Sequence, residues 1–308
     1  MTPNHLAIEL VDVTKQYSDV LAADSVSFKV REGEFFGLLG PNGAGKTTTI
    51  NMMTSILKPS KGKIRILGLD VKKRAVEVRK NVGLVFQDSA LDRQLTVREN
   101  LMFAGMLHGL KKNLIEKRLT ELLTLFGLED KKDKPVGSLS GGQRRGVDIA
   151  RGVVHKPRVL FLDEPTIGLD VSARVRIWRF IHKLRKSDGI TIVLTTHYLE
   201  EAESCDNVCF IDKGKIVLDG KPEALIKQFD SEILEIESSD IDELYPSLCK
   251  LLGEGRVDFK TAYFKAKKNE ETFVAQKIDH IKKEFSSKVR RVSIRPINLN
   301  DVFLWVNA

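Results

Sequence analysis

The feature that most constrains this chain of 308 residues is a glycine-rich loop placed between a strand-like and a helix-like segment. Phe35–Leu39 is continuously apolar, as buried central strands are, and Gly40–Thr47 follows it directly. The loop matches the pattern G-x-x-x-x-G-K-[ST], in which glycines allow several backbone N–H groups to surround phosphate oxygens. Lys46 then places a positive charge near the terminal phosphates, and the hydroxyl of Thr47 is a ligand for Mg²⁺. A glycine-rich turn without a ligand is the alternative.

The strand before the loop and the helix after it make nucleotide binding the favoured interpretation. A helix that begins near Lys46 adds the partial positive charge of its N-terminus to the phosphate site. The predicted phosphate-binding residues are Gly40, Pro41, Asn42, Gly43, Ala44, Gly45, Lys46, Thr47 and Thr48.

A second polar feature follows another apolar run, Val159–Leu162. Asp163 and Glu164 come directly after it, at the end of a strand where open α/β sheets bind their ligands. Asp163 is expected to hold Mg²⁺ through water, and Glu164 to orient and deprotonate an attacking water. Alone, two acids at the end of an apolar run are equally compatible with an ordinary strand end. Downstream of a phosphate loop, they predict nucleotide hydrolysis.

The distribution of charge argues against a nucleic-acid partner. The formal net charge is +8, yet residues 231–308 contain 13 basic and 13 acidic side chains, so the excess lies in the first three-quarters of the chain. There is no basic tail, and no nucleic-acid binding is expected. Two basic runs, Lys72–Arg74 and Arg144–Arg145, are expected to form solvated faces, with contact to anionic lipid headgroups as the alternative.

Cysteine content and hydropathy bear on the compartment. Three cysteines and the lack of a basic-then-apolar leader argue against a secreted, disulfide-stapled domain. No apolar run approaches the roughly 18–20 residues that span a bilayer. The chain is therefore expected to lie in the cytoplasm and to reach a membrane only through a partner.

Strand-like and helix-like segments alternate through residues 1–228, which predicts an α/β domain. Between Thr96 and Leu125 the apolar spacing becomes helical and predicts an inserted helical segment. Residues 229–308 predict a small α+β domain. The strands expected in the first domain are Ile8–Val13, Val26–Val30, Phe35–Leu39, Val159–Leu162 and Ile190–Leu194. In the second, strands are expected at Ile233–Ile236, Thr272–Val274 and Val289–Ile294, and helices at Ile241–Leu252 and Val274–Phe285.

The pentapeptide Leu139–Gln143, Leu-Ser-Gly-Gly-Gln, separates the many families that share a phosphate loop. It is the signature of the ATP-binding cassette (ABC) family, which the chain resembles over residues 5–228. The resemblance implies a P-loop NTPase with a RecA-like core, an antiparallel β subdomain and a helical subdomain that carries the signature. It also implies ATP and Mg²⁺ as ligands. Further family markers occur in order: Tyr17 for stacking on adenine, Gln87 as the Q-loop residue and Mg²⁺ ligand, Asp170 in the D-loop and His197 as the switch histidine.

The resemblance implies a site that two subunits complete, in a homodimer or with a second, paired cassette. The signature residues are expected at a helix N-terminus, which favours anions; they are Ser140, Gly141, Gly142 and Gln143. In the family this position closes on the γ-phosphate held by the Lys46 loop of the other subunit. The residues implied in hydrolysis are Glu164, His197 and Gln87.

Each of these single residues also has an ordinary structural alternative. A Ser or Asp in such a position can cap a helix, as Ser140 and Asp170 would. Tyr17 fits an edge aromatic, and His197 fits a hydrogen-bonded core histidine. Only the shared order of the motifs favours the functional interpretation.

Within the family, the chain is similar to the ATPase subunits of daunorubicin-resistance-type exporters, which pair with an ABC-2 permease. The similarity rests on Phe36–Gly43, Ile149–Asp170 and the ending Arg295–Leu304; Gly146, Val147 and Asn298–Asn300 depart from it. It implies a peripheral ATPase at the cytoplasmic face of the membrane. This ATPase would power export of drugs or other hydrophobic compounds, and an integral-membrane permease would dock on the helical insert around Glu99–Phe103.

Two other functions stay open. The ATPase of a polysaccharide or lipid exporter would carry the same motifs, with a different task for the C-terminal domain. A soluble cassette that acts on nucleic acid or ribosomes would share the ATP site, but a single cassette without a coiled coil and with a neutral tail does not favour it.

Overall fold

A computed structural model describes residues 5–229, 231–267, 271–285 and 288–306. The chain divides into two compact units, Met1–Lys221 and Pro222–Ala308. This boundary lies before the predicted division at residue 228, because helix α8 (Pro222–Gln228) packs against α11 (Leu299–Val306) of the second unit. Within the described ranges, no helix is both long and apolar enough to cross a bilayer.

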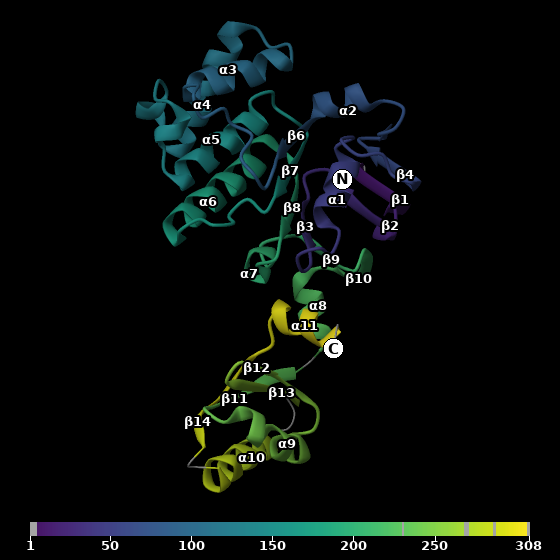
Figure 1. Cartoon of the computed structure of the whole chain (residues 1–308), viewed down its shortest axis with the longest axis vertical. Coiled ribbons are helices and arrows are strands. Elements are labelled where there is room, and N and C mark those ends of the chain that lie inside the picture. The colour runs from purple at the N-terminus through teal and green to yellow at the C-terminus, as the bar shows by residue number, and fades with distance from the viewer. Residues whose placement is uncertain (1–4, 230, 268–270, 286–287, 307–308) are drawn as a thin grey trace. The chain divides into compact units, whose positions relative to one another are not determined.

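A six-stranded sheet forms the centre of the N-terminal unit (Figure 1). Its strands, in spatial order, are β10 (Lys215–Gly220), β9 (Asn207–Asp212), β3 (Phe35–Leu39), β8 (Thr191–Thr196), β7 (Val159–Asp163) and β6 (Val82–Val85). Every residue of β3, β7 and β8 is buried, as their continuous apolar runs predict. All neighbours are parallel except β10 and β9, so the carboxyl ends of β3, β7 and β8 share one edge.

A four-stranded antiparallel sheet forms a second layer of this unit, in the order β2 (Val20–Arg31), β1 (Leu6–Tyr17), β4 (Lys61–Ile66) and β5 (Leu69–Asp70). Both sheets contribute to one apolar core. Phe28 of β2 stacks on Phe36 of β3 with ring centroids 5.0 Å apart. The predicted α/β class, with an antiparallel subdomain, is confirmed.

The predicted helical insert is two helices, α3 (Val97–Leu107) and α4 (Lys112–Phe126). Thr96 and Glu99 form a capping box at the start of α3. Gly109, at a φ of 75°, separates the two helices, because a left-handed residue cannot continue a right-handed helix. Both pack against α5 in one helical cluster (Figure 1). The other helices of the unit are α1 (Lys46–Met53), α2 (Ala75–Asn81), α5 (Gly141–Val153), α6 (Val171–Asp188) and α7 (Leu199–Ala202), with 3-10 turns at Glu129–Lys131 and Val136–Ser138.

The C-terminal unit is an α+β fold, as predicted, around a four-stranded antiparallel sheet. Its strands, in spatial order, are β12 (Gly255–Asp258), β13 (Thr261–Lys267), β11 (Ser231–Ser238) and β14 (Val289–Pro296); α9 (Ile241–Leu252) and α10 (Glu271–Glu284) complete it. The strand predicted at Thr272–Val274 is wrong, because these residues lie in the first turn of α10. The hairpin of β12 and β13 was not predicted.

The C-terminal motif that resembles the exporter family centres on Asp301. This side chain is fully buried, accepts hydrogen bonds from both terminal nitrogens of Arg295 and lies 3.3 Å from Arg256. It also accepts from the backbone N–H of Asn298, while the Asn298 side chain accepts from the backbone N–H of Asp301, so the two residues form a reciprocal cap at the start of α11. Arg295 contacts Glu235 of β11 as well, and these carboxylates raise the pKa of its guanidinium. The motif therefore fastens α11 to the sheet.

Replacing Asp301 by alanine is expected to destabilise the C-terminal unit by about 2–3 kcal/mol, because Arg256 and Arg295 lose a buried carboxylate partner, with Glu235 left for Arg295 alone, and α11 loses one half of its reciprocal cap. The measurement is hydrogen exchange of the β11 and β14 amides in the full chain. Asp258→Ala, at an exposed position of the same unit, is the control and should leave their protection unchanged. Equal protection in the two variants would show that the Asp301 contacts contribute little.

Candidate functional site

The phosphate loop lies at the carboxyl end of β3 and borders a cavity of about 510 Å³. Predicted residues of the phosphate loop, of the Q-loop and of the segment after β7 line it together with the first residues of β2; these predicted residues are Asn42, Gly43, Gly45, Lys46, Thr47, Thr48, Gln87 and Glu164. Gly40 and Gly45 have φ angles of 149° and 103°, which favour glycine. A Cβ at either position would meet a backbone oxygen at 2.1 or 2.2 Å. Backbone geometry thus requires glycine here.

Lys46 is held inside the loop rather than in solvent. Its side chain is 5% exposed, and its ammonium donates to the carbonyl oxygens of Gly40 (2.8 Å) and Pro41 (3.0 Å). The ammonium lies 3.7 Å from a carboxylate oxygen of Glu164. Burial lowers the pKa of Lys46, and Glu164 and Asp163 oppose that shift. A phosphate group would add the further negative charge that such a desolvated cation favours.

The two acids at the end of β7 are fixed by a residue that the sequence analysis did not assign, Thr195 of β8. Its hydroxyl donates to a carboxylate oxygen of Asp163 and accepts from the backbone N–H of Glu164 at 3.0 Å. Glu164 has a φ of 45°, a left-handed conformation that side-chain-bearing residues seldom adopt and that the surroundings must hold. The signal for Thr195 was its place at the end of a buried strand beside His197.

The carboxylate of Glu164 also faces His197. Its second oxygen lies 3.4 Å from Nδ1 of His197, and both atoms are buried without a hydrogen-bond partner among the described residues. Buried polar atoms in folded proteins are normally hydrogen-bonded, so this pair is a candidate place for a polar ligand. Lys46, Glu164 and His197 thus converge on one point beside the phosphate loop.

Glu201 of α7 links the segment that carries Glu164 to the segment that carries His197. Its carboxylate is buried and accepts from the hydroxyls of Thr166 and Thr196, the latter at 2.8 Å. Thr166 lies two positions after Glu164, and Thr196 directly precedes His197. One buried carboxylate therefore sets the spacing of both segments. The sequence analysis gave Glu201 no role.

Among the described residues, the signature motif lies outside the lining of the phosphate cavity. Ser140 is the N-cap of α5, where its hydroxyl and the side chain of Gln143 form a capping box. Asp170 caps α6 by accepting from the backbone N–H of Ala173 at 2.8 Å. These caps match the structural alternatives for both residues. The capping box does not use the N–H groups of Gly141 and Gly142 in the first turn of α5.

Tyr17 is exposed at the end of β1 and does not line the phosphate cavity in the part of the chain described. It pairs with Val20 across the β1–β2 hairpin, and Val20 does line the cavity. The ammonium of Lys15 lies 5.0 Å from the centre of the Tyr17 ring. Tyr17 thus lies beside a residue that lines the cavity. Its stacking on adenine stays a prediction.

The prediction of a solvated face at Arg144–Arg145 is wrong for Arg145. This side chain of α5 is 8% exposed and donates to backbone carbonyls of the Q-loop and of the segment after β7. Its pKa is lowered by burial. The sequence shows two adjacent arginines but not that the helix turns the second one inward.

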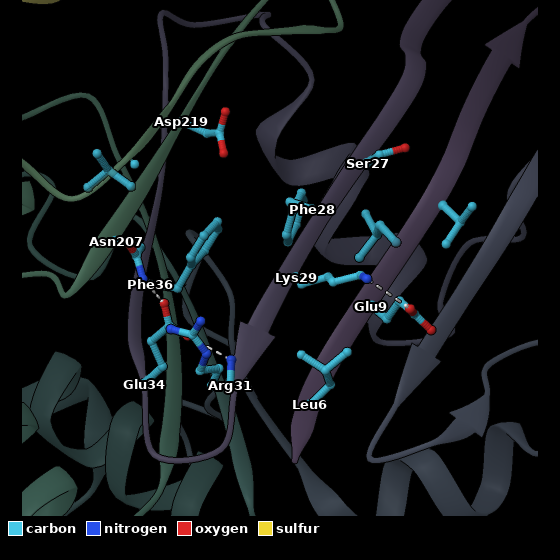
Figure 2. Close-up of a pocket in the computed structure, with 14 residues that line it drawn as sticks. Leu6, Glu9, Ser27, Phe28, Lys29, Arg31, Glu34, Phe36, Asn207 and Asp219 are labelled. Atoms are coloured by element: carbon cyan, nitrogen blue, oxygen red, sulfur yellow. Dashed lines mark hydrogen bonds and ion pairs between the residues drawn. The ribbon is translucent and has the colours of Figure 1, made fainter. Parts of the chain in front are cut away.

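A second cavity, of about 830 Å³, lies between the antiparallel sheet and the edge of the parallel sheet (Figure 2). Its walls include the stacked rings of Phe28 and Phe36. Two of its carboxylates are already paired: Glu34 accepts from Asn207 and from the N–H of Arg31, and Glu9 lies 3.8 Å from the ammonium of Lys29. The third, Asp219, is exposed. Among the described residues that line this cavity, there is no phosphate loop and no unpaired buried acid like Glu164.

Comparison with known proteins decides the family. The family model described as ABC transporter matches residues 23–167. The Nod factor export ATP-binding protein I of Bradyrhizobium diazoefficiens is 39% identical over 306 residues, which cover 99% of this chain and 97% of that protein. The chain belongs to the ATP-binding proteins of the ABC transporter family.

Other relatives agree with this assignment. The protein of the same description from Ralstonia nicotianae is 40% identical over 292 residues, covering 94% of this chain and 90% of the relative. A dimeric, post-hydrolysis ATP-binding cassette with bound ADP and phosphate superimposes with a TM-score of 0.65 and 29% identity, over 70% of this chain and 98% of that one. The ABC chain described here is therefore an ATPase that binds ATP, as its motifs predict.

Proposed function

We propose that this ABC ATPase powers export through a separate integral-membrane permease, to which it binds at the cytoplasmic face of the membrane as one of two cassettes. The observation that carries the proposal is that the predicted hydrolytic residues lie together, whereas the signature residues do not line the phosphate cavity in the described structure. Lys46, Glu164 and His197 converge within one subunit, whereas Ser140 needs a nucleotide bound elsewhere. The relatives are named for Nod factor export, and the similar solved cassette is a dimer, which supports this arrangement.

The residues suit Mg²⁺ as a companion of the nucleotide. Thr47 and Gln87 line the same cavity and offer hydroxyl and amide oxygens, and Asp163 at the nearby strand end offers a carboxylate. These are the hard oxygen ligands that Mg²⁺ prefers. When bound there, the ion would neutralise charge on the terminal phosphates.

The proposed reaction follows from the side chains. Glu164 takes a proton from a water molecule, whose oxygen bonds to the γ-phosphorus while the bond to the β–γ bridging oxygen breaks. Lys46 stabilises the charge on the phosphates, and His197 contacts the γ-phosphate beside Glu164. The tyrosine ring of Tyr17 stacks on adenine, and Ser140, Gly141 and Gly142 of the partner cassette close over the γ-phosphate.

The permease is proposed to dock on an exposed apolar stripe of α3. Phe103, Met106 and Leu107 are 57%, 55% and 72% exposed and follow the i, i+3, i+4 spacing of one helix face. An apolar stripe of this kind in a water-exposed helix favours a protein partner. The stripe follows the Q-loop in the chain, so a permease segment seated there could sense Gln87.

This proposal is tested by Phe103→Glu combined with Leu107→Glu, which places two charges on the stripe. We expect about a tenfold loss of the permease that copurifies from gently solubilised membranes, because desolvated apolar contacts commonly contribute the 1.4 kcal/mol that a factor of ten represents. The ATPase activity of the isolated chain should stay within about twofold, because the stripe lies outside the phosphate cavity.

Val11→Glu, at an apolar position of β1 that is also partly exposed, is the matched control and should copurify normally. Recovery of ribosomes or nucleic acid in place of a membrane protein would favour the soluble alternative. The cargo is proposed to be a hydrophobic or amphipathic compound, with a polysaccharide or lipid as the alternative; its contacts belong to the permease.

A further inference from the structure

The guanidinium of Arg145 ties its own helix, α5, to the backbone that follows two neighbouring strands of the sheet, β6 and β7. From α5, its Nε donates to the carbonyl of Pro165 at 2.8 Å, and Nη2 donates to the carbonyls of Asp163 (3.0 Å) and Glu164 (3.1 Å). Nη1 donates to the carbonyl of Phe86 at 2.6 Å and, more weakly, to that of Gln87 at 3.4 Å. The five N–H groups of an arginine thus meet five backbone carbonyls.

These acceptors lie on both sides of the proposed catalytic base. Three consecutive carbonyls, those of residues 163–165, surround the left-handed backbone of Glu164, and the other two lie at the root of the Q-loop. Buried charge-assisted hydrogen bonds of this kind are strong and directional. A strained backbone conformation persists only where its surroundings hold it.

The charge of Arg145 is compensated within its own helix. Asp148 is fully buried, with its carboxylate 3.7 Å from Arg145 and 3.4 Å from Arg151. Burial raises the pKa of Asp148, and the two arginines oppose that shift. Arg151 shares Asp148 as its counter-ion but does not contact the carbonyls around Glu164 in the described structure. The two arginines therefore differ in whether they bind the backbone at Glu164.

We propose that Arg145 is a positioning residue, which holds the backbone at Glu164 and Gln87 so that the signature helix, the Q-loop and the base move as one body. Closure of Ser140 on a partner's nucleotide would then be transmitted directly to Glu164. The inference rests on the proposed role of Glu164, but it predicts a different kinetic result from loss of the base itself.

Arg145→Met keeps the length of the side chain and removes its donors. We expect kcat for ATP hydrolysis by the full chain to fall by about 100-fold, the usual effect of misplacing a catalytic group by about 1 Å. Equilibrium binding of a fluorescent ATP analogue should change by less than about threefold, because no phosphate-loop residue contacts Arg145 in the described structure. Arg145→Lys should recover part of kcat, since an ammonium can reach some of the carbonyls but not all of them.

Arg151→Met is the control for loss of a charge beside Asp148. It should lower the melting temperature about as much as Arg145→Met while keeping kcat within about threefold. Equal losses of kcat in the two methionine variants, in proportion to their melting temperatures, would overturn the proposal in favour of a purely structural role. Full activity of Arg145→Met would overturn it as well. If Glu164→Gln were active while Arg145→Met was not, the identity of the base would be wrong rather than the role of the arginine.

Discussion

Glu164→Gln is expected to lower the kcat for ATP hydrolysis by about 1,000-fold, within the range that a positioned general base contributes. Glutamine has nearly the same shape but cannot accept the proton of the attacking water. ATP binding should be retained or strengthened, because the replaced carboxylate lies 3.7 Å from the ammonium of Lys46 and competes with phosphate for it. The variant should therefore hold ATP and accumulate as a dimer.

The measurement combines steady-state hydrolysis, ATP binding and gel filtration with and without ATP. Glu203→Gln makes the same chemical change at an exposed position after α7 and should hydrolyse ATP at the wild-type rate. A wild-type rate in Glu164→Gln would show that another group activates the water. A loss of ATP binding in parallel with hydrolysis would instead assign Glu164 to the structure of the loop.

The parts of this site that the sequence predicts are those in which residue type and backbone geometry are inseparable. Gly40 and Gly45 adopt conformations that favour glycine, so the loop can be recognised in the sequence from the spacing of its glycines. The strands β3 and β7 can be predicted from their continuous apolar runs, because both faces of a central parallel strand are buried.

The parts that it does not predict depend on contacts between distant segments. Arg145 donates to the backbone carbonyls of Phe86 and Pro165, which are far from it along the chain. Every residue has a backbone carbonyl, so the sequence does not indicate which ones an arginine contacts. Glu201 similarly looks like any acid in an amphipathic helix until Thr166 and Thr196 are seen to meet it.

The C-terminal unit shows the limit of short patterns. Thr272–Val274 combines β-branched and aromatic residues, which favour strands, yet it lies in α10 because the longer stretch to Glu284 has helical spacing. Conversely, the β12–β13 hairpin turns at Phe259, which has a φ of 50°. Phenylalanine is not one of the residue types that usually indicate a turn, so the sequence does not predict this hairpin.

The second large effect concerns the phosphate loop, where a single methyl group is expected to abolish function. Gly45→Ala would place a Cβ 2.2 Å from the carbonyl oxygen of Ala22 at a φ of 103°. Real Cβ atoms essentially never approach that closely, so the phosphate loop or the backbone of β2 at Ala22 must shift, directly beside the start of α1. We expect ATP affinity to fall by at least about 100-fold, or about 2.7 kcal/mol.

Gly68→Ala is the control that places an alanine in a left-handed conformation without the close Cβ contact expected in Gly45→Ala. Gly68 has a φ of 78° and open space around its Cα, and it lies in the β4–β5 turn, outside the phosphate cavity in the described structure. This variant should lose about 1 kcal/mol of stability and keep its ATP affinity. Binding measured by titration with a fluorescent ATP analogue distinguishes the cases: similar affinities for the two variants would mean that the loop tolerates displacement, and that phosphate binding depends on Lys46 rather than on the path of the backbone.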